Sequence, residues 1–246
     1  MNDTRQPIIA IDGPAGSGKS TIARLTALRA GLPFVSSGAM YRAVALLAMR
    51  EGVKATDRAE LIRIAAALQM HFVSEPNGVV RSFLDSEDVT EALQQPAVAQ
   101  VASAIATIPE LRAELVAKQR AYGRQGGVVM EGRDIQTVVF PDADIKIFLT
   151  ASAEERARRR WKELIALGEP TEYSTVLAEV RERDTRDETR AASPLRAAPD
   201  AIPINTDGLS IEQVVACVLK IITSWRNDPA LKGELLARAA KCEQGS

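Results

Sequence analysis

The sequence predicts an α/β fold: a doubly wound parallel sheet with helices on both of its faces. Short apolar runs typical of strands alternate with longer helical patterns, which is the order that parallel pairing requires. A glycine-rich turn also joins the first predicted strand directly to a helix. The chain has 246 residues, 46% of them hydrophobic and 26% charged, which suits one such domain with insertions.

Four apolar runs are the predicted strands of this sheet. They span residues 7–12, 128–130, 145–150 and 201–205. The first leads into a helix that ends near Ala30, the third into a helix that begins near Ser152, and the fourth into a helix over 210–225. Ligands of doubly wound sheets bind at the carboxyl ends of the strands, so we expect the functional site there.

The stretch over about 56–100 departs from this alternation. A helix opened by Asp57, with Glu60 three residues later, precedes two short strand-like runs around residues 75–78. We interpret this stretch as a subdomain inserted into a single domain over 1–226, followed by a weakly amphipathic tail over 227–246. The segment over about 155–185 is rich in arginine and glutamate, which is typical of a solvated helical pair unless a phosphate site lies elsewhere in the chain.

The composition argues against several classes of function. Lys+Arg (31) and Asp+Glu (32) nearly cancel and only 4% of residues are aromatic, so neither nucleic acid nor a membrane is an expected partner. No apolar stretch approaches the roughly 20 residues that span a bilayer, and no signal peptide is evident, so we expect a cytoplasmic protein. We also expect a monomer, since no long apolar seam is evident. His71, the only histidine, lies in a strand-like run and is interpreted as structural.

The glycine-rich turn is the strongest functional signal. It fits the pattern G-x-x-x-x-G-K-[ST], in which backbone N–H groups at a helix N-terminus surround phosphate oxygens. Lys19 is expected to neutralise the β- and γ-phosphates of ATP, and the Ser20 hydroxyl to bind Mg²⁺. The predicted nucleotide-binding residues are Gly13, Pro14, Ala15, Gly16, Ser17, Gly18, Lys19, Ser20 and Thr21.

Arginines and aspartates elsewhere predict a second anionic ligand. Residues 131–134 (Glu-Gly-Arg-Asp) close the second predicted strand, although a structural ion pair is an alternative. Arg183, Asp187 and Arg190 are spaced so that they share one helix face. Residues 36–42 place a hydroxyl and an arginine where another helix begins, although a simple helix cap is equally consistent. So many guanidinium groups in a chain of nearly zero net charge suit a second phosphate and a sugar.

Together these motifs resemble the bacterial cytidylate kinases, in the nucleoside monophosphate kinase branch of P-loop proteins. The resemblance spans most of the chain, and its motifs lie in the family's order at 13–21, 37–42, 132–135, 137–143 and 183–195. The first motif is widespread, whereas the others together are specific. The resemblance implies transfer of the γ-phosphoryl group of ATP to CMP or dCMP, in pyrimidine nucleotide metabolism. It also implies that the insert binds the monophosphate and that the arginine-rich segment is a mobile lid.

The resemblance further implies roles for individual residues. Ser103, Arg112 and Asp134 are implied in binding the cytosine ring, whose N4 amine needs an acceptor while O2 and N3 need donors. Arg183 and Asp187 are implied near the sugar. Arg42, Arg133 and Arg190 are implied near the acceptor phosphate, and Ser37 and Tyr41 are further expected substrate-binding residues. Those expected to surround the transferring group are Lys19, Arg133, Arg190 and a lid arginine near 158–160, for which we take Arg160.

Two positions depart from the family pattern. Ser36 stands where the family usually has Asp, so we do not expect metal positioning to depend on this residue. Gln136 stands where the family usually has Gly, at a turn where backbone freedom is expected. Two alternatives stay open: a kinase for another small-molecule acceptor, and a nucleotide-dependent switch or binding protein that needs no second phosphate site.

Overall fold

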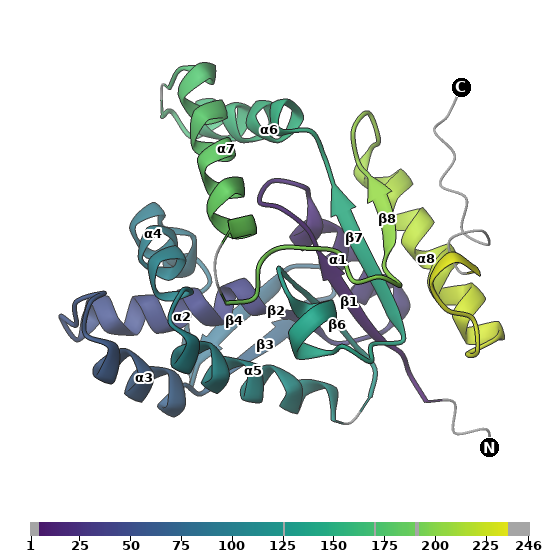
Figure 1. Ribbon diagram of the computed structural model, residues 1–246, viewed down its shortest axis with the longest axis horizontal. Coiled ribbons are helices and arrows are strands. Elements are labelled where there is room, and N and C mark those ends of the chain that lie inside the picture. The colour runs from purple at the N-terminus through teal and green to yellow at the C-terminus, as the bar shows by residue number, and fades with distance from the viewer. Residues whose placement is uncertain (1–4, 125, 170, 190–191, 236–246) are drawn as a thin grey trace.

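The computed structural model describes residues 5–124, 126–169, 171–189 and 192–235. Its centre is a five-stranded parallel sheet in the order β2-β6-β1-β7-β8, which confirms the predicted α/β class (Figure 1). The strands are β1 (Ile8–Asp12), β2 (Phe34–Ser36), β6 (Val128–Gly132), β7 (Ile145–Thr150) and β8 (Ile202–Asn205).

Four of these strands lie at the predicted apolar runs, and the sequence reasoning missed the fifth. β2 has only three residues and pairs at the edge of the sheet with β6 alone. A run this short has too few residues to show a periodicity, so only its pairing with β6 defines it as a strand.

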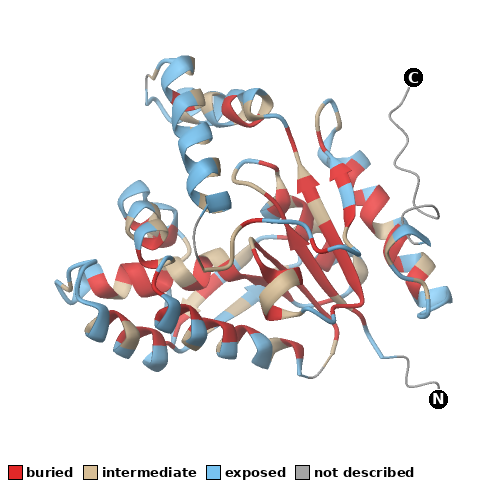
Figure 2. Ribbon diagram, in the orientation of Figure 1, coloured by how far each residue is buried: buried red, intermediate tan, exposed pale blue. Residues whose placement is uncertain are grey.

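Two hydrophobic clusters enclose the sheet, one on each face. Along β1, Ala10 belongs to the cluster that includes α2 and α5, whereas Ile9 and Ile11 belong to the cluster with α1 and α8. This alternation follows from the two-residue period of a strand. Because both faces are covered, the strands are buried along most of their length (Figure 2).

The helices of the predicted alternation begin and end at recognisable caps. Gly18 and Gly31 flank α1 in left-handed conformations, and the side chains of Ser36, Ser152 and Ser210 each accept a backbone N–H at the start of α2, α6 and α8. These helices are α1 (Lys19–Ala30), α2 (Ser37–Arg50), α6 (Ala153–Ala166), α7 (Tyr173–Thr189) and α8 (Ile211–Asn227). The pair α6–α7 stands beyond the carboxyl ends of the strands (Figure 1).

The segment after Thr56, which departs from the alternation of strands and helices, contains a second, antiparallel sheet in the order β3-β4-β5. Asp57 caps the preceding helix by accepting the N–H of Glu60 at 3.3 Å, as its position in the sequence predicts. Further helices continue to Gly123, beyond the expected end near 100. The elements are α3 (Arg58–Ala67), β3 (Met70–Ser74), β4 (Val80–Leu84), β5 (Glu87–Asp88), a 3₁₀ turn (Ala92–Gln94), α4 (Pro96–Ile105) and α5 (Pro109–Gly123).

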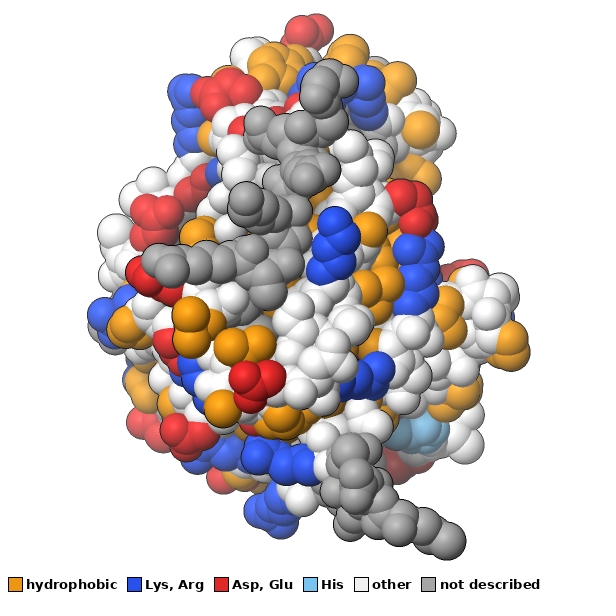
Figure 3. Space-filling view, turned by 90° about the vertical axis from the view of Figure 1, so that its right-hand side faces the viewer, with side chains coloured by type: hydrophobic (Ala, Val, Ile, Leu, Met, Phe, Trp, Pro, Cys, Tyr) orange, Lys and Arg blue, Asp and Glu red, His pale blue; other side chains and the backbone are white. Residues whose placement is uncertain are grey.

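The surface matches the nearly balanced composition. On the face that carries α8, acidic and basic side chains are interspersed rather than gathered into a patch of one sign (Figure 3). Among the described residues, no helix combines the length and apolar character needed to cross a membrane. Leu231 of the tail packs against the α1–α8 cluster, whereas residues 236–246 lie outside the described part of the chain.

Candidate functional site

A cavity of about 270 Å³ opens at the carboxyl ends of β1, β2 and β6. It is lined by the glycine-rich turn, the start of α2, α4, the Glu131–Asp134 segment and α7. It brings together nearly all residues predicted for the acceptor, and their individual roles stay predictions. These are Ser37, Tyr41, Arg42, Ser103, Arg112, Arg133, Asp134, Arg183 and Asp187. Arg190, also predicted here, lies outside the described residues.

The glycine-rich turn has the backbone geometry that a phosphate site needs. Gly16 and Gly18 have φ angles of +78° and +84°, which L side chains rarely adopt. At Gly13 a Cβ would overlap the carbonyl oxygen of Leu149 on the neighbouring strand. The Ser17 hydroxyl is buried and has no hydrogen-bond partner within the described ranges. The turn therefore needs glycine at these positions and carries an unsatisfied hydroxyl, as expected of a cradle for phosphate oxygens.

Lys19 is buried at the floor of the cavity, only 6% exposed. Its ammonium group donates to the carbonyl oxygen of Pro14 at 3.3 Å. Burial, with a further contribution from the nearby Arg133 guanidinium, lowers the pKa of Lys19 to about 7, and Glu131 offsets part of this shift. Without an anion in the cavity the positive charge is poorly compensated, which is the electrostatic signature of a site for phosphate.

Two arginines that line the cavity, Arg42 and Arg133, have N–H groups available for an anion. The Arg42 Nε is buried and has no acceptor among the residues that the structure describes. Burial is also the main cause that lowers the pKa of Arg42. Arg133 is held by Asp187, whose Oδ2 accepts its Nε–H at 2.9 Å, which leaves other guanidinium N–H groups for a ligand. An anionic group that entered between them would satisfy both side chains.

The deep end of the cavity holds a buried ion pair. Arg112 and Asp134 are each about 5% exposed and are joined by a direct ion pair. Arg112 also donates to the carbonyl oxygen of Ala106 at 3.0 Å and lies 5.5 Å from the ring centroid of Tyr41. One wall thus offers a carboxylate acceptor beside guanidinium donors, the two kinds of group that the edge of a pyrimidine base would need.

Ser36 and Gln136, the two residues that depart from the family pattern, each make side-chain hydrogen bonds. The Ser36 hydroxyl donates to Glu131 Oε1 at 2.5 Å, so a carboxylate reaches this end of the cavity from β6 instead. Gln136 is 1% exposed, and its side chain accepts the Ala198 N–H at 2.9 Å and donates to Ile147 at 3.2 Å. Its φ is not positive, so the expectation that this turn needs glycine-like freedom is wrong.

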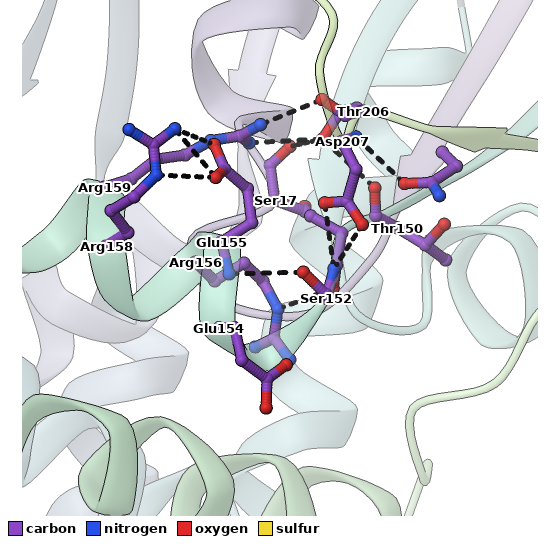
Figure 4. Close-up of polar contacts among 12 residues, drawn as sticks. Ser17, Thr150, Ser152, Glu154, Glu155, Arg156, Arg158, Arg159, Thr206 and Asp207 are labelled. Carbon is purple, nitrogen blue, oxygen red and sulfur yellow. Dashed lines mark hydrogen bonds and ion pairs between the residues drawn. The ribbon is translucent and has the colours of Figure 1, made fainter. Parts of the chain in front are cut away.

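A larger cavity, of about 960 Å³, lies between the glycine-rich turn and the α6–α7 pair. Arg158, Arg159 and Arg160 line it, and all three have partners, of which those of Arg158 and Arg159 are drawn in Figure 4. Arg158 binds Glu155, and Arg159 reaches Thr206 Oγ1 at 3.2 Å. Arg160, which is predicted to meet the transferring group, pairs with Glu163 at 3.4 Å. Arg160 therefore stays a prediction.

Three further residues were not singled out as site residues, although Arg156 belongs to the same arginine run as Arg160. Arg156 is 4% exposed and joins α6 to Asp184 of α7 and to the Ala15 carbonyl oxygen of the turn. Arg186 lines both cavities and donates to Ser103 Oγ at 3.3 Å. Asp12 is fully buried at the end of β1. The charge of Asp12 at the end of an apolar strand was the one sequence signal that could have revealed it.

His71 takes no part in either cavity. It lies on β3 and its ring stacks on Phe83, with the centroids 5.2 Å apart. This place fits the structural interpretation of the only histidine.

Comparison with known proteins gives a consistent result. Residues 9–224 match the family model described as "Cytidylate kinase". The cytidylate kinase of Pelotomaculum thermopropionicum is 50% identical over 222 residues, covering 90% of this chain and 98% of that protein. The cytidylate kinase of Solibacter usitatus is 48% identical, covering 91% and 96%, and that of Geobacter sulfurreducens is 48% identical, covering 85% and 89%.

Proposed function

The chain belongs to the cytidylate kinase family and is an ATP-dependent nucleoside monophosphate kinase, and we propose that its acceptors are CMP and dCMP. The products would be ADP and CDP or dCDP. The observation that supports this best is the single cavity that joins the glycine-rich turn, the arginines and the Arg112–Asp134 pair. The groups proposed to bind the ATP phosphates, the acceptor phosphate and the acceptor base then lie next to one another.

The reaction needs alignment and charge neutralisation rather than a strong base. An oxygen of the acceptor phosphate is already anionic near neutral pH and attacks the γ-phosphorus as the bond to the bridging β–γ oxygen breaks. Lys19 would neutralise the donor phosphates, while Arg42 and Arg133 would hold the acceptor in line. Arg160 and Arg190 are proposed to complete the charge around the transferring group. No covalent enzyme intermediate is required.

The residues present suit a magnesium ion. Mg²⁺ in phosphoryl transfer takes few protein ligands, and when bound it would offset the negative charge of the phosphates. The Ser20 hydroxyl is exposed to the cavity, and Glu131 lines the same cavity. We propose Ser20 as the direct protein ligand, while Glu131, held by Ser36, orients the surroundings.

The sugar and base would bind between α4 and α7. Arg183 and Asp187 lie one turn apart on α7 and face the cavity, where they can bind ribose hydroxyls. Asp134 would accept the N4 amine of cytosine, and Arg112 and Ser103 would donate to the acceptor atoms of the ring. The segment after Thr56 would then be the acceptor-binding insert, and α6–α7 the lid.

Several wider expectations belong to the same proposal. A monomer that works in the cytoplasm, without nucleic acid or membrane, fits a small-molecule kinase of nearly zero net charge. The proposed division is one catalytic domain over 1–226 and a tail over 227–246.

A coupled assay of ADP formation tests this function. With ATP as donor we expect CMP and dCMP to be the best acceptors among CMP, dCMP, UMP, AMP and shikimate. Asp134→Ala should lower the preference for CMP over UMP by at least about tenfold, because a site that loses its acceptor no longer favours the amine. Asp142→Ala, an exposed aspartate in the next loop, serves as the control.

The same assay separates the alternatives. A kinase for another acceptor would favour UMP, AMP or shikimate, and would keep its preference after Asp134→Ala. A switch or binding protein would hydrolyse ATP slowly with no stimulation by any acceptor. Either result would overturn the assignment of CMP.

A further inference from the structure

Asp12 is a buried carboxylate that the proposed chemistry does not use. It ends β1 with no exposed surface. Its Oδ1 accepts the backbone N–H of Ile135 at 3.1 Å and its Oδ2 that of Gln136 at 2.9 Å. These are the first two N–H groups of a π-helical segment, Ile135–Val139. Asp12 therefore acts as the N-terminal cap of a segment 123 residues away in the sequence.

The residue that would ordinarily provide this cap is Asp134. It occupies the N-cap position of the π-helical segment, and an aspartate there usually bonds the free N–H groups of its own helix. Here the Asp134 side chain makes no such bond and pairs instead with Arg112 in the cavity. The Asp12 carboxylate thus caps the backbone, and the Asp134 carboxylate lines the cavity.

A charged carboxylate is costly to bury if its role is only to cap a helix. Asp12 makes no ion pair within the described ranges. Burial raises the pKa of Asp12 to about 7, although the two backbone hydrogen bonds from Gln136 and Ile135 oppose this increase. An asparagine or serine could accept a backbone N–H without burying a charge. A carboxylate is the group that accepts both N–H bonds at once, so it holds residues 133–136 in a single conformation.

We propose that Asp12 is a positioning residue for base recognition: it caps Ile135–Val139 in place of Asp134 and so leaves the Asp134 carboxylate free for the acceptor base. This inference rests on the proposed function. Without Asp12, the Asp134 carboxylate would compete to cap its own helix, and both Arg133 and Asp134 would lose their fixed backbone. Loss of Asp12 would therefore weaken acceptor binding and the preference for cytosine, and it would leave ATP binding nearly unchanged.

The test compares Asp12→Asn with the wild type for CMP and UMP at saturating ATP. We expect KM for CMP to rise and the ratio of kcat/KM for CMP over UMP to fall by about tenfold, the effect of losing one such cap. KM for ATP should change by less than about threefold. A double substitution with Asp134→Ala should lower the ratio no further than Asp134→Ala alone, because both act through one carboxylate.

Asp144→Asn is the matched control. Asp144 is also a buried carboxylate that accepts a backbone N–H of β1, that of Ile8 at 3.0 Å, but at the opposite end of the strand. Asp144→Asn should lower thermal stability and leave the CMP over UMP ratio unchanged. If Asp12→Asn does not yield folded protein, Asp12→Ser keeps one acceptor and serves for the same comparison.

Three outcomes would overturn the inference: an unchanged ratio in the folded Asp12 variant, an equal fall in Asp144→Asn, or additive effects with Asp134→Ala. These outcomes are distinct from failure of the proposed function. In that case the wild type itself would show no preference for CMP.

Discussion

At the scale of single residues, Lys19 couples the site to pH. Its pKa lies near 7 because the ammonium group is buried and surrounded by cationic side chains. The unfolded chain holds a proton at this lysine up to pH about 10.5, so between the two values the folded state binds fewer protons. The contribution of Lys19 to folding stability therefore rises with pH across that window.

Nucleotide binding should reverse this shift, because phosphate oxygens favour the charged ammonium. We expect ATP binding at about pH 8.5, where the free protein holds Lys19 mostly neutral, to take up close to one proton. Titration calorimetry in two buffers of different ionisation enthalpy measures the uptake. Lys19→Met should abolish it and lower kcat by at least about 100-fold, with the fold retained. Equal uptake by Lys19→Met would contradict the assignment, and Lys220→Met, an exposed lysine of α8, is the control.

At the scale of elements, the buried Arg156 links both helices of the α6–α7 pair to the glycine-rich turn. Arg156 donates to Asp184 with two N–H groups, at 2.9 Å and 2.5 Å, and to the Ala15 carbonyl oxygen at 3.1 Å. Gly16 permits this close approach, since a Cβ there would lie 3.1 Å from the Arg156 Cβ. The junction before α6 is also held, because Asp207 accepts the Ser152 N–H at 3.0 Å (Figure 4).

Removal of Arg156 should loosen the helical pair without unfolding the sheet. Arg156→Met leaves Asp184 partly buried and unpaired, a cost of about 3 kcal/mol for such pairs. We expect several-fold faster proteolysis within residues 153–189 and a several-fold higher KM for ATP. Arg158→Met is the control, because Arg158 is exposed and its ion-pair partner, Glu155, lies on the same helix. Identical behaviour of the two variants would argue against this role of Arg156.

At the scale of the whole molecule, charge is distributed unevenly although it nearly cancels. The formal net charge is −1, yet Lys19, Arg42, Arg133 and Arg183 meet at one cavity. Elsewhere the ion pairs are mostly exposed, as those of Arg50–Glu87 and Arg63–Glu51 are. Exposed pairs contribute little to stability, whereas a cationic cavity attracts an anionic ligand over about a Debye length.

Salt should therefore affect substrate binding more than folding. Raising KCl from about 50 to about 500 mM shortens the Debye length to a few ångströms, so we expect KM for CMP to rise several-fold. The urea midpoint should change little over the same range, because screened surface pairs contribute little. A fall in the urea midpoint that parallels the rise in KM would show instead that salt acts on the fold.

The sequence by itself determined those features that depend on neighbouring residues. Apolar runs, capping residues and the glycine-rich turn are local, so four strands of the main sheet, the start of α3 at Asp57 and the turn before the helix that Lys19 begins could be predicted. The spacing of Arg183 and Asp187 likewise placed both on one helix face. The resemblance of motifs supplied the other residues that are predicted to bind the acceptor.

Only the tertiary structure decided which distant groups meet. β2 becomes a strand because β6 lies beside it, and Gln136 is fixed by contacts with Ile147 and Ala198. Arg156 looks like any other arginine of its run until Asp184 and Ala15 surround it. Asp12 caps a segment far along the chain because parallel pairing brings the ends of β1 and β6 together. Burial and hydrogen-bond partners across more than 100 residues follow from sheet order, which local patterns do not encode.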